Sequence, residues 1–451
     1  MKAVVFLVAF LMAPVYAQFD FGVICSTDNR LATGPNNSHK LAYRSEIVFP
    51  DRDTATVVFQ SSESIYLCLS GNGTGQPWSR PVALYPGANP GIAYGRNGNR
   101  HLVWEMFDTT LGARNIFYRN LEYRMEPINV SGCTSACYHP DVLGDSVGIA
   151  HIVWAEDSGS FRQIYYRRVN QSGIIGEREL ISSARFCDLP AIEQFGDEIC
   201  VIWEQYGTTL AQAYKIVRRR YANGAWQPEE VLMAGNERLG SPSLDFSLGN
   251  EGFSAAWEKT VAGNPEVHFE GGNPGGGYPT DGASTAPVMA TVGNVWSYLF
   301  WQEESTGVND IYTHFYYFMT GWSRGSLRRV FMLNEPVYAP NCLGALLVWT
   351  QGDTAPYKVM WGFFEYPIGV KEQTAHSRDG DAAKLVNRII MGKVYYAQWQ
   401  MHLYDASGRR VMELQPGAND MMRLAPGVYF VRGAANIRLD AKGSGKVIIT
   451  R

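Results

Sequence analysis

The chain has 451 residues with a formal net charge of −4; 13% of residues are aromatic, 46 are glycine and only 18% are charged. Many aromatic residues and glycines with few charges are typical of an all-β extracellular protein. The slightly acidic balance gives no basic footprint for a phosphate backbone, which excludes nucleic acid as an expected partner.

Residues 1–17 have the pattern of a secretory signal peptide, with basic Lys2, an apolar run and the small Ala17 before Gln18. An N-terminal membrane anchor is the alternative, but the apolar run is shorter than the roughly 20 residues of a spanning helix. No later segment has the pattern of a membrane span. We therefore expect a mature chain that is secreted or held on the outer cell surface, with no membrane span after cleavage.

One sequence pattern recurs through residues 18–366. An apolar strand ends in a marker tryptophan at Trp104, Trp154, Trp203, Trp257, Trp301 and Trp349, and Phe59 marks a weaker first copy. A marker proline precedes each tryptophan, at Pro90, Pro140, Pro190, Pro242, Pro287 and Pro340. The interval of about 44 to 54 residues between markers indicates a repeat architecture.

About four short strands in roughly 48 residues make one blade, so seven repeats predict a seven-bladed β-propeller. Solenoid repeats are shorter, and sandwiches need about twice the length. Residues 23–33 resemble the outer strands of later repeats, and we expect them to pair with residues 357–364 and close the last blade. The glycine-rich residues 270–282 predict a loop; no Gly-Lys-Ser/Thr follows, which excludes a phosphate-binding loop.

The marker tryptophans admit two interpretations. They could form a ring of sugar-stacking platforms, or they could pack between adjacent blades. Because they recur with the blade period directly after apolar strand residues, we favour packing in the core.

Acidic residues follow the marker tryptophans. In a propeller the loops after these tryptophans and before the marker prolines share one face, which predicts an acidic rim around the mouth of the channel. Its members are Glu105, Asp108, Glu156, Asp157, Glu204, Glu258, Glu303, Glu304 and Asp353. Such a rim could attract a cation or bind glycan hydroxyls, or consist only of solvated loop residues. Two members could form a glycosidase pair, but the sequence does not give their separation.

Seven cysteines fit an oxidising compartment without forming a dense disulfide framework. Cys133 and Cys137 flank a short turn and are one candidate pair; Cys187 and Cys200 are a second, and Cys25, Cys68 and Cys342 remain. A zinc site at Cys133, Cys137 and His139 is disfavoured, because the spacing fits no standard zinc pattern. We expect no metal and no cofactor.

The recurring sequence pattern over residues 40–365 resembles the propellers of the sialidase superfamily. That resemblance implies three arginines around a carboxylate, an Asp acid/base and a Tyr–Glu nucleophile pair. Arg44, Arg185 and Arg238 are the candidate arginines. Arg44 departs from the family's Arg-Ile-Pro motif, because Ser45 and Glu46 follow it. In addition, no repeat contains a good Asp-box motif. We expect the three guanidinium groups not to converge.

Residues 367–384 are polar and predict a linker, and residues 385–451 alternate as in a small Ig-like β-sandwich. The segments LYDASGRRV (403–411), PGVYFV (426–431) and KVII (446–449), in this order, resemble the type A sorting domain of type IX secretion cargo. That resemblance implies the type IX secretion machinery as a partner; an ordinary Ig-like module is the alternative.

The sequence therefore predicts a secreted or cell-surface propeller that binds extracellular glycan or protein without catalysis. A sialidase-like or other glycoside hydrolase is the alternative, and a purely structural surface-layer role is a third reading. The ligand does not follow from the sequence.

Overall fold

A computed structural model of the chain describes residues 18–44, 54–71, 77–95, 97–123, 126–184, 186–207, 213–247, 252–270, 280, 282–292, 296–304, 307, 309–317, 321–322, 328–329, 335–344, 346–365, 386–391, 394–397, 401–405, 409–414, 417–420, 424, 427–433 and 444–450. The chain divides into two units, Met1–Ile368 and Gly369–Arg451. Within the described residues, no helix is long and apolar enough to cross a membrane. The signal peptide and the linker predicted by the sequence lie outside the described residues.

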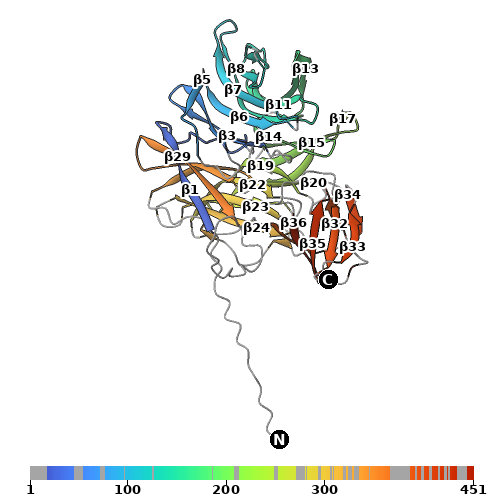
Figure 1. The fold of residues 1–451 in the computed structure, drawn as a ribbon. Helices are drawn as coiled ribbons and strands as arrows, with labels where there is room; N and C mark the ends of the chain where they lie inside the picture. The colour runs from blue at the N-terminus through green and yellow to red at the C-terminus, as the bar shows by residue number, and fades with distance from the viewer. Residues whose placement is uncertain are drawn as a thin grey trace. The chain divides into compact units, whose positions relative to one another are not determined.

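The first unit is a seven-bladed β-propeller, which confirms the predicted fold (Figure 1). In blades 1 to 4 each inner strand is followed outward by its neighbours. Blade 1 holds β2 (Leu41–Arg44), β3 (Thr54–Ser61), β4 (Ser64–Ser70) and β5 (Val82–Pro86); blade 2 holds β6 (Ala88–Tyr94), β7 (Arg100–Asp108), β8 (Ala113–Asn120) and β9 (Ile128–Asn129); blade 3 holds β10 (Cys137–Gly144), β11 (Ala150–Ser158), β12 (Phe161–Asn170) and β13 (Gly173–Leu180); blade 4 holds β14 (Cys187–Phe195), β15 (Glu198–Tyr206), β16 (Tyr214–Ala222), β17 (Ala225–Trp226) and β18 (Glu230–Gly235).

Blades 5 to 7 follow the same plan. Blade 5 holds β19 (Leu239–Ser247), β20 (Gly252–Val261) and β21 (Asn264–Phe269); blade 6 holds β22 (Ala283–Val292), β23 (Trp296–Glu304), β24 (Asn309–Tyr317), β25 (Gly321–Trp322) and β26 (Arg328–Arg329); blade 7 holds β27 (Val337–Leu343), β28 (Leu346–Gln351), β29 (Tyr357–Glu365) and β1 (Gln18–Thr27). Most of the glycine-rich segment 270–282 lies outside the described residues.

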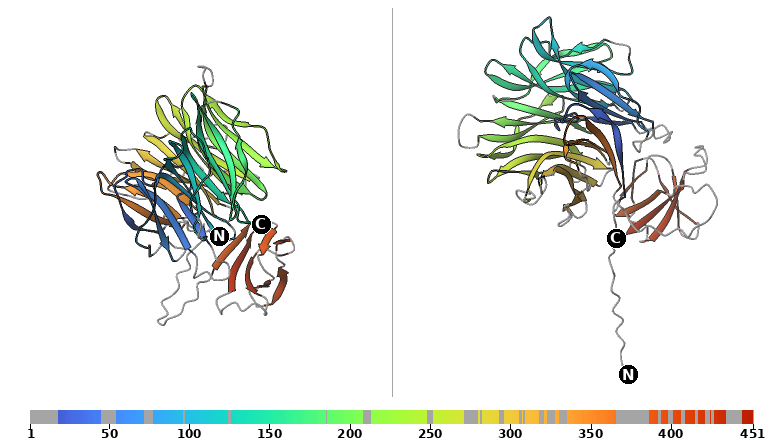
Figure 2. Two further views of the ribbon diagram at one scale, coloured as in Figure 1. Left: turned by 90° about the horizontal axis from the view of Figure 1, so that it is seen from above. Right: turned by 90° about the vertical axis from the view of Figure 1, so that its left-hand side faces the viewer.

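The N-terminal strand completes the last blade. β1 pairs antiparallel with β29 from Gln18 opposite Glu365 to Thr27 opposite Tyr357. In the right-hand view of Figure 2 the orange β29 accordingly lies beside the blue N-terminal strands. Hydrogen bonds between the two ends of the propeller chain thus close the ring, because the N-terminal strand covers the edge of β29 in the last blade.

The marker tryptophans are core residues. Each lies on the second strand of its blade, and none is more than 3% exposed. Trp154 of blade 3, for example, packs in one cluster with Val103 and Ile116 of blade 2. The prediction that these rings pack between neighbouring blades is confirmed, and a row of exposed sugar platforms is excluded.

The marker prolines lie inside the inner strands, which corrects the prediction that they follow a loop. Each inner strand of blades 2 to 7 has an irregular register at its proline, as between Tyr138 and Asp141 in β10. The residue before each proline has a positive φ: Asn89 (47°), His139 (52°), Leu189 (49°), Ser241 (48°), Ala286 (49°) and Ala339 (48°). A non-glycine residue in the left-handed conformation costs about 1–2 kcal/mol. Its recurrence at the same position in six blades indicates that the β-bulge is a regular feature of this propeller.

The second unit holds two sheets in its described residues. One has the order β30 (Val386–Met391), β36 (Ser444–Thr450), β35 (Gly427–Gly433), β32 (Met401–Asp405), β33 (Arg410–Leu414), and the other pairs β31 (Val394–Ala397) with β34 (Gly417–Asp420). β30 and β36 run parallel, whereas the other pairs are antiparallel. The Ig-like assignment stays a prediction.

Candidate site: the channel axis and the seam between blades 3 and 4

A single segment, residues 33–40, lies where the inner strands converge. We call it the axial segment. Thr33, Asn37, Ser38 and Lys40 are each at most 2% exposed, although all four are polar. Buried polar groups need partners, because an unpaired one costs about 1–3 kcal/mol.

The partners are the backbone carbonyls of the bulges. The axial segment donates to one carbonyl oxygen in each of blades 2 to 7. The donors and acceptors are Lys40 Nζ to Pro90 O (2.6 Å), Asn37 Nδ2 to His139 O (3.2 Å) and Pro190 O (2.7 Å), Asn36 Nδ2 to Ser241 O (3.1 Å) and Pro287 O (2.6 Å), and Thr33 Oγ1 to Ala339 O (2.8 Å). The bulges therefore turn carbonyls toward the axis, where four side chains tie six blades together.

The pKa values of two groups in the axial segment, Lys40 and His39, are shifted in opposite directions. Burial lowers the pKa of Lys40 to about 7 against the attraction of Asp141 and Glu105. A neutral amine still has N–H donors for Pro90 O and for Ser38 Oγ, which it also contacts. Burial also disfavours a charged His39, but the carboxylates of Asp141, Glu193 and Asp245 outweigh it and raise the pKa of His39 to about 9.

The N–H groups of the same bulges are satisfied from the preceding blade. The side chain one residue after the marker aromatic, which we call the seam acceptor, accepts from the N–H of the left-handed residue in the next blade. The pairs are Gln60 with Asn89 N (3.3 Å), Glu105 with His139 N (2.8 Å), Glu204 with Ser241 N (3.0 Å), Glu258 with Ala286 N (2.7 Å) and Gln302 with Ala339 N (3.4 Å). In blade 7, Thr350 Oγ1 accepts from Thr33 N of the axial segment (3.4 Å).

Blade 3 is the exception, because Ala155 occupies the position of the seam acceptor. The N–H of Leu189 instead donates to Oδ1 of the adjacent Asp188 at 2.9 Å. No side chain of blade 3 is needed for that bulge. Asp188 is thereby placed at the seam, where the other blades have no carboxylate of this kind.

A network of charges surrounds Asp188. Its Oδ1 lies 2.7 Å from His139 Nδ1, and its Oδ2 accepts from Arg162 Nη1 at 2.5 Å. Arg162 Nε also donates to Asp157 (2.9 Å), and its guanidinium stacks over the ring of Tyr138 at 4.1 Å. Two carboxylates thus face one guanidinium and one imidazole, which makes the network electrically neutral when His139 is protonated.

The pKa shifts agree with this pairing. Although burial opposes both shifts, contact with Asp188 raises the pKa of His139, and contact with His139 and Arg162 lowers the pKa of Asp188. His139 therefore favours its imidazolium form and Asp188 its carboxylate form. A group whose pKa is lowered in this way is a poor general acid at neutral pH.

Two pockets meet at this network. The central pocket, of about 520 Å³, has the axial residues Gly34, Pro35 and Asn36 on its wall. Its remaining lining is Asn29, Leu31, Gln60, Asn89, His139, Thr285, Ala286, Gln302 and Ala339. The seam pocket, of about 360 Å³, is lined by Asp157, Gly159, Ser160, Phe161, Arg162, Phe186, Cys187, Asp188 and Tyr206. The bonded pair His139 and Asp188 contributes one residue to each pocket.

The carboxylates of the predicted rim divide into two groups. Glu105, Glu156, Glu204 and Glu303 are at most 3% exposed, which corrects their expected position on an open rim. Glu258, Asp108, Asp157, Glu304 and Asp353 keep some exposure. Asp157 alone of these residues lines the seam pocket. Ligand binding by the rim residues stays a prediction.

The candidate arginines of the sialidase resemblance are only partly described. Arg238 is exposed and precedes β19. The backbone of Arg44 ends β2, but its side chain and all of Arg185 lie outside the described residues. The convergence of these three groups therefore stays an expectation.

Sequence reasoning missed Asn36, Asn37, Asp188 and Arg162. The polar run GPNNSHK before the first repeat and the single departure at Ala155 were the available signals. A periodic pattern directs attention to positions that recur, whereas these residues occur once.

No protein family matches the chain, and no curated protein sequence matches it. Among solved structures, it is similar to a Mycobacterium tuberculosis puromycin-hydrolyzing peptidase (12% identity, TM-score 0.49), covering 88% of this chain and 61% of that one. It is also similar to a polysaccharide lyase (7%, TM-score 0.46; 72% and 90% covered) and to the six-bladed fucose-binding lectin of Aleuria aurantia (12%, TM-score 0.37; 66% and 99% covered). Likenesses this distant give no information about what this chain binds.

Proposed function

We propose that this propeller is a secreted or cell-surface binding module that holds a neutral extracellular glycan at the seam pocket and the adjoining central pocket. The observation that carries the proposal is the composition of the seam pocket. Phe161, Phe186 and Tyr206 supply aromatic surface beside the network of Asp157, Arg162 and Asp188. Pockets that combine aromatic walls with a few fixed polar groups suit small ligands.

The charge balance favours a neutral ligand. Arg162 is paired with both Asp157 and Asp188, so it offers no uncompensated positive charge to an anionic sugar. The paired carboxylate and guanidinium groups can still accept from and donate to hydroxyls. Contact with His139 and Arg162 lowers the pKa of Asp188, which favours its carboxylate form and supports binding without hydrolysis.

The test is a glycan and polysaccharide screen followed by calorimetry on the best ligand. Phe161→Ala should weaken binding at least tenfold, because it removes a pocket wall. Phe107→Ala is the matched control: this ring is 61% exposed and lines neither pocket. Equal affinities of the two variants would refute the proposed site, and no binding by the wild type would refute the function.

A glycoside hydrolase is the second candidate. The Tyr206 hydroxyl donates to Glu204, and the sialidase resemblance implies such a Tyr–Glu pair. Burial and the Glu204 carboxylate raise the pKa of Tyr206, which disfavours a phenolate nucleophile. Sugar released by the wild type and not by Tyr206→Phe would establish this candidate in place of the binding module.

For delivery, we propose export through the general pathway and then the type IX route. The N-terminal pattern of residues 1–17 and the resemblance of residues 385–451 to a sorting domain support this route. Deletion of residues 385–451 should trap the propeller in the periplasm. Normal surface delivery of the truncated chain would contradict the assignment of the tail.

A further inference from the structure

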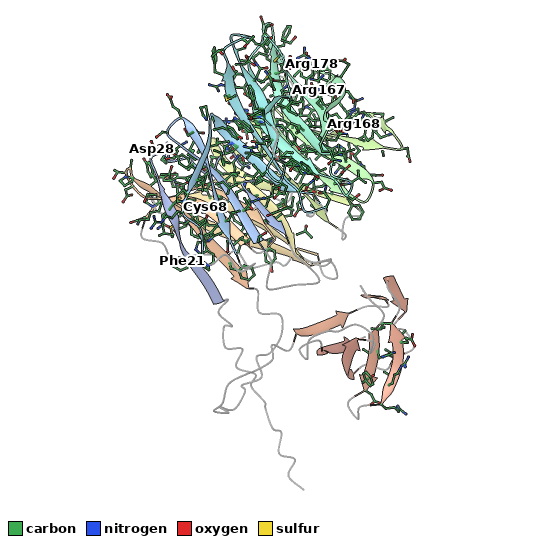
Figure 3. The ribbon with its side chains drawn as sticks, turned by 45° about the horizontal axis from the view of Figure 1, so that its top comes forward. Phe21, Asp28, Cys68, Arg167, Arg168 and Arg178 are labelled. Carbon is green, nitrogen blue, oxygen red and sulfur yellow. The ribbon has the colours of Figure 1, made fainter. Side chains whose placement is uncertain are left out.

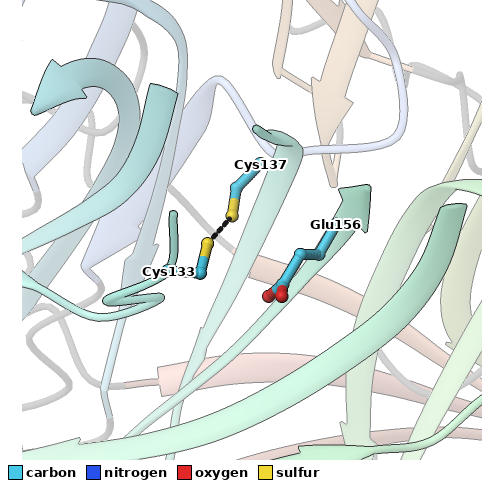
Figure 4. A group of neighbouring side chains, drawn as sticks. All are labelled: Cys133, Cys137 and Glu156. Carbon is cyan, nitrogen blue, oxygen red and sulfur yellow. Dashed lines mark hydrogen bonds between the residues drawn. The ribbon is translucent and has the colours of Figure 1, made fainter. Parts of the chain in front are cut away.

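Four of the seven cysteines lie in two close pairs. The sulfur atoms of Cys133 and Cys137 are 2.7 Å apart, and both residues are buried (Figure 4). The loop between them is fixed locally, because Asn115 Oδ1 accepts from Cys133 N (3.0 Å) and from Ser131 Oγ (2.8 Å). The two thiols therefore already face each other in an ordered turn.

The second pair joins two different blades. Cys25 lies on β1 of blade 7, and it packs against the cluster that contains Cys68 of blade 1. The neighbouring Cys68 thiol and burial both raise the pKa of the Cys25 thiol. The register of β1 against β29 shifts between Val23 and Cys25, directly before this cysteine. In Figure 3, Cys68 is labelled in the same part of the ring as Phe21 of β1 and Asp28 just beyond it.

The other three cysteines have no such neighbour. Cys187, Cys200 and Cys342 belong to three separate core clusters. In the β14–β15 ladder Cys187 lies opposite Gln205, and Cys200 lies opposite Glu193. About five residues of strand, roughly 17 Å, separate the two thiols along the ladder, so the candidate pair Cys187 and Cys200 does not form a disulfide.

A metal ion is the competing occupant of the first pair. The donor atoms of Cys133, Cys137 and Glu156 all lie within 4.8 Å of one another. However, Glu156 Oε2 accepts from Trp154 Nε1 (3.2 Å), and Arg178 donates to its Oε1. Both oxygens are engaged, and the guanidinium would repel a cation at this position.

We infer that the folded chain forms two disulfides, Cys133–Cys137 and Cys25–Cys68, and keeps Cys187, Cys200 and Cys342 as thiols. The inference rests on the proposed export only for the compartment in which the bonds form. Oxidants of the right chemical class are the disulfide of a thiol–disulfide oxidoreductase or oxidised glutathione.

Each bond forms by two exchange steps. One cysteine thiolate attacks a sulfur of the donor disulfide, which breaks that S–S bond and releases one donor thiolate. The second cysteine thiolate then attacks the mixed disulfide and releases the other donor thiolate. The cysteine pair loses two protons and two electrons, and the donor gains them as two thiols. A hydrogen bond from Cys137 lowers the pKa of Cys133, which makes Cys133 the attacking sulfur of its pair.

The Cys25–Cys68 bond would make the closure of the ring covalent. It would join the strand that completes blade 7 to the third strand of blade 1 and close a loop of about 43 residues. Cys133–Cys137 would span only about four residues, so it should constrain the unfolded chain much less.

The test is a thiol count on the full chain after refolding equilibration in a glutathione redox buffer. We expect three alkylated cysteines in denaturant without reductant, seven after reduction, and a mass difference of about 4 Da for the four hydrogens lost. Peptide mapping should give the two stated pairs. Seven free thiols, another pairing, or zinc bound in place of the first disulfide would overturn the inference.

Matched variants separate the two bonds. Reduction should lower the thermal midpoint of the wild type by several degrees and have little effect on Cys25→Ser/Cys68→Ser, whereas Cys133→Ser/Cys137→Ser should respond like the wild type. Equal responses of all three proteins would contradict the role of Cys25–Cys68 in closure. Glycan binding measured on the same samples reports on the proposed function independently, because neither pair includes a residue proposed to contact the ligand.

Discussion

The seam between blades 3 and 4 differs from the other seams of the propeller. Elsewhere, as at Glu258 and Ala286, a side chain of one blade accepts from the bulge of the next. Between blades 3 and 4 that position is Ala155, and Asp188 serves the bulge from within blade 4. At the ordinary seams a Gln, Glu or Thr side chain is the acceptor, whereas at the exceptional seam Asp188 contacts both His139 and Arg162.

This difference shows how a repeat protein can gain a site without losing its fold. The bulge needs one acceptor for its N–H, and either neighbour can supply it. Where the acceptor comes from the following blade, the preceding blade needs no polar side chain at that position, and Ala155 packs in the core. The acceptor of this bulge, Asp188, is one of the residues that line the seam pocket.

The largest effect is expected from Asn37→Ala. Asn37 joins the carbonyls of His139 and Pro190 across the exceptional seam, which has no seam acceptor. Two buried carbonyls would lose their partner, and the unfolding free energy should fall by about 2–4 kcal/mol. Denaturant unfolding measures this value, with Gln171→Ala at an exposed amide as the control.

Asn36→Ala makes the equivalent change at an ordinary seam, the one between blades 5 and 6. Asn36 joins blades 5 and 6 through Ser241 and Pro287, where Glu258 also links the two blades. We expect a smaller loss, about 1–2 kcal/mol, because the second link remains. A loss equal to that of Asn37→Ala would show that the seam acceptors contribute nothing to the coupling between blades.

Glu258→Ala tests a seam acceptor directly. It leaves the Ala286 N–H without its 2.7 Å partner and should cost about 1–3 kcal/mol. Glu258→Gln keeps an acceptor oxygen and should cost less than half as much. If both variants unfold at the same denaturant concentration as the wild type, the bond does not stabilise the seam.

Asp188→Asn should change the titration of His139. Contact with Asp188 raises the pKa of His139, so removing the charge should lower that pKa, as followed by NMR of the imidazole. The raised pKa stabilises the fold below the unfolded value of about 6.5, and this contribution is lost as pH rises through the folded value. Asp188→Asn should therefore lose most stability below pH 6.5, and this loss should disappear as pH falls through the lowered pKa of Asp188 in the wild type. An unchanged His139 titration would refute the pairing.

The smallest effect concerns the pH dependence of the axial segment. The pKa of His39 is raised to about 9, so its contribution is lost as pH rises to that value; the pKa of Lys40 is lowered to about 7, so its penalty is relieved as pH rises above 7. Between pH 7 and 9 the two contributions oppose each other. As pH rises from 7 to 9, the unfolding free energy of His39→Gln should therefore increase relative to that of the wild type. Parallel plots of unfolding free energy against pH for the two proteins would contradict the assignment.

The fold was predictable because it repeats. Trp104 and its equivalents recur with an interval that only a blade explains, and the burial of these rings follows from the apolar residues before them. The position of Glu105 was not predictable in the same way. The sequence pattern ends the strand at Trp104, whereas β7 continues to Asp108, so Glu105 lies within the strand and inside the seam.

The candidate site was less predictable, because its residues come together only through the ring. Asn37 precedes Pro190 by about 153 positions, and no local pattern connects an amide in one segment to a carbonyl so far along the chain. Asp188 and Arg162 lie in different blades, and only the packing of those blades brings them together.

The axial segment also has a consequence for the order in which the ring can assemble during synthesis. Residues 33–40 leave the ribosome before blades 2 to 7, and so does β1, the partner of the last blade. Each new blade therefore emerges when its amide, hydroxyl or amine donor is already present, and blade 7 can be completed as soon as β29 is made. A nascent chain of this design can add blades one at a time around the axial segment. The ring closes only when β29 of the final blade pairs with β1.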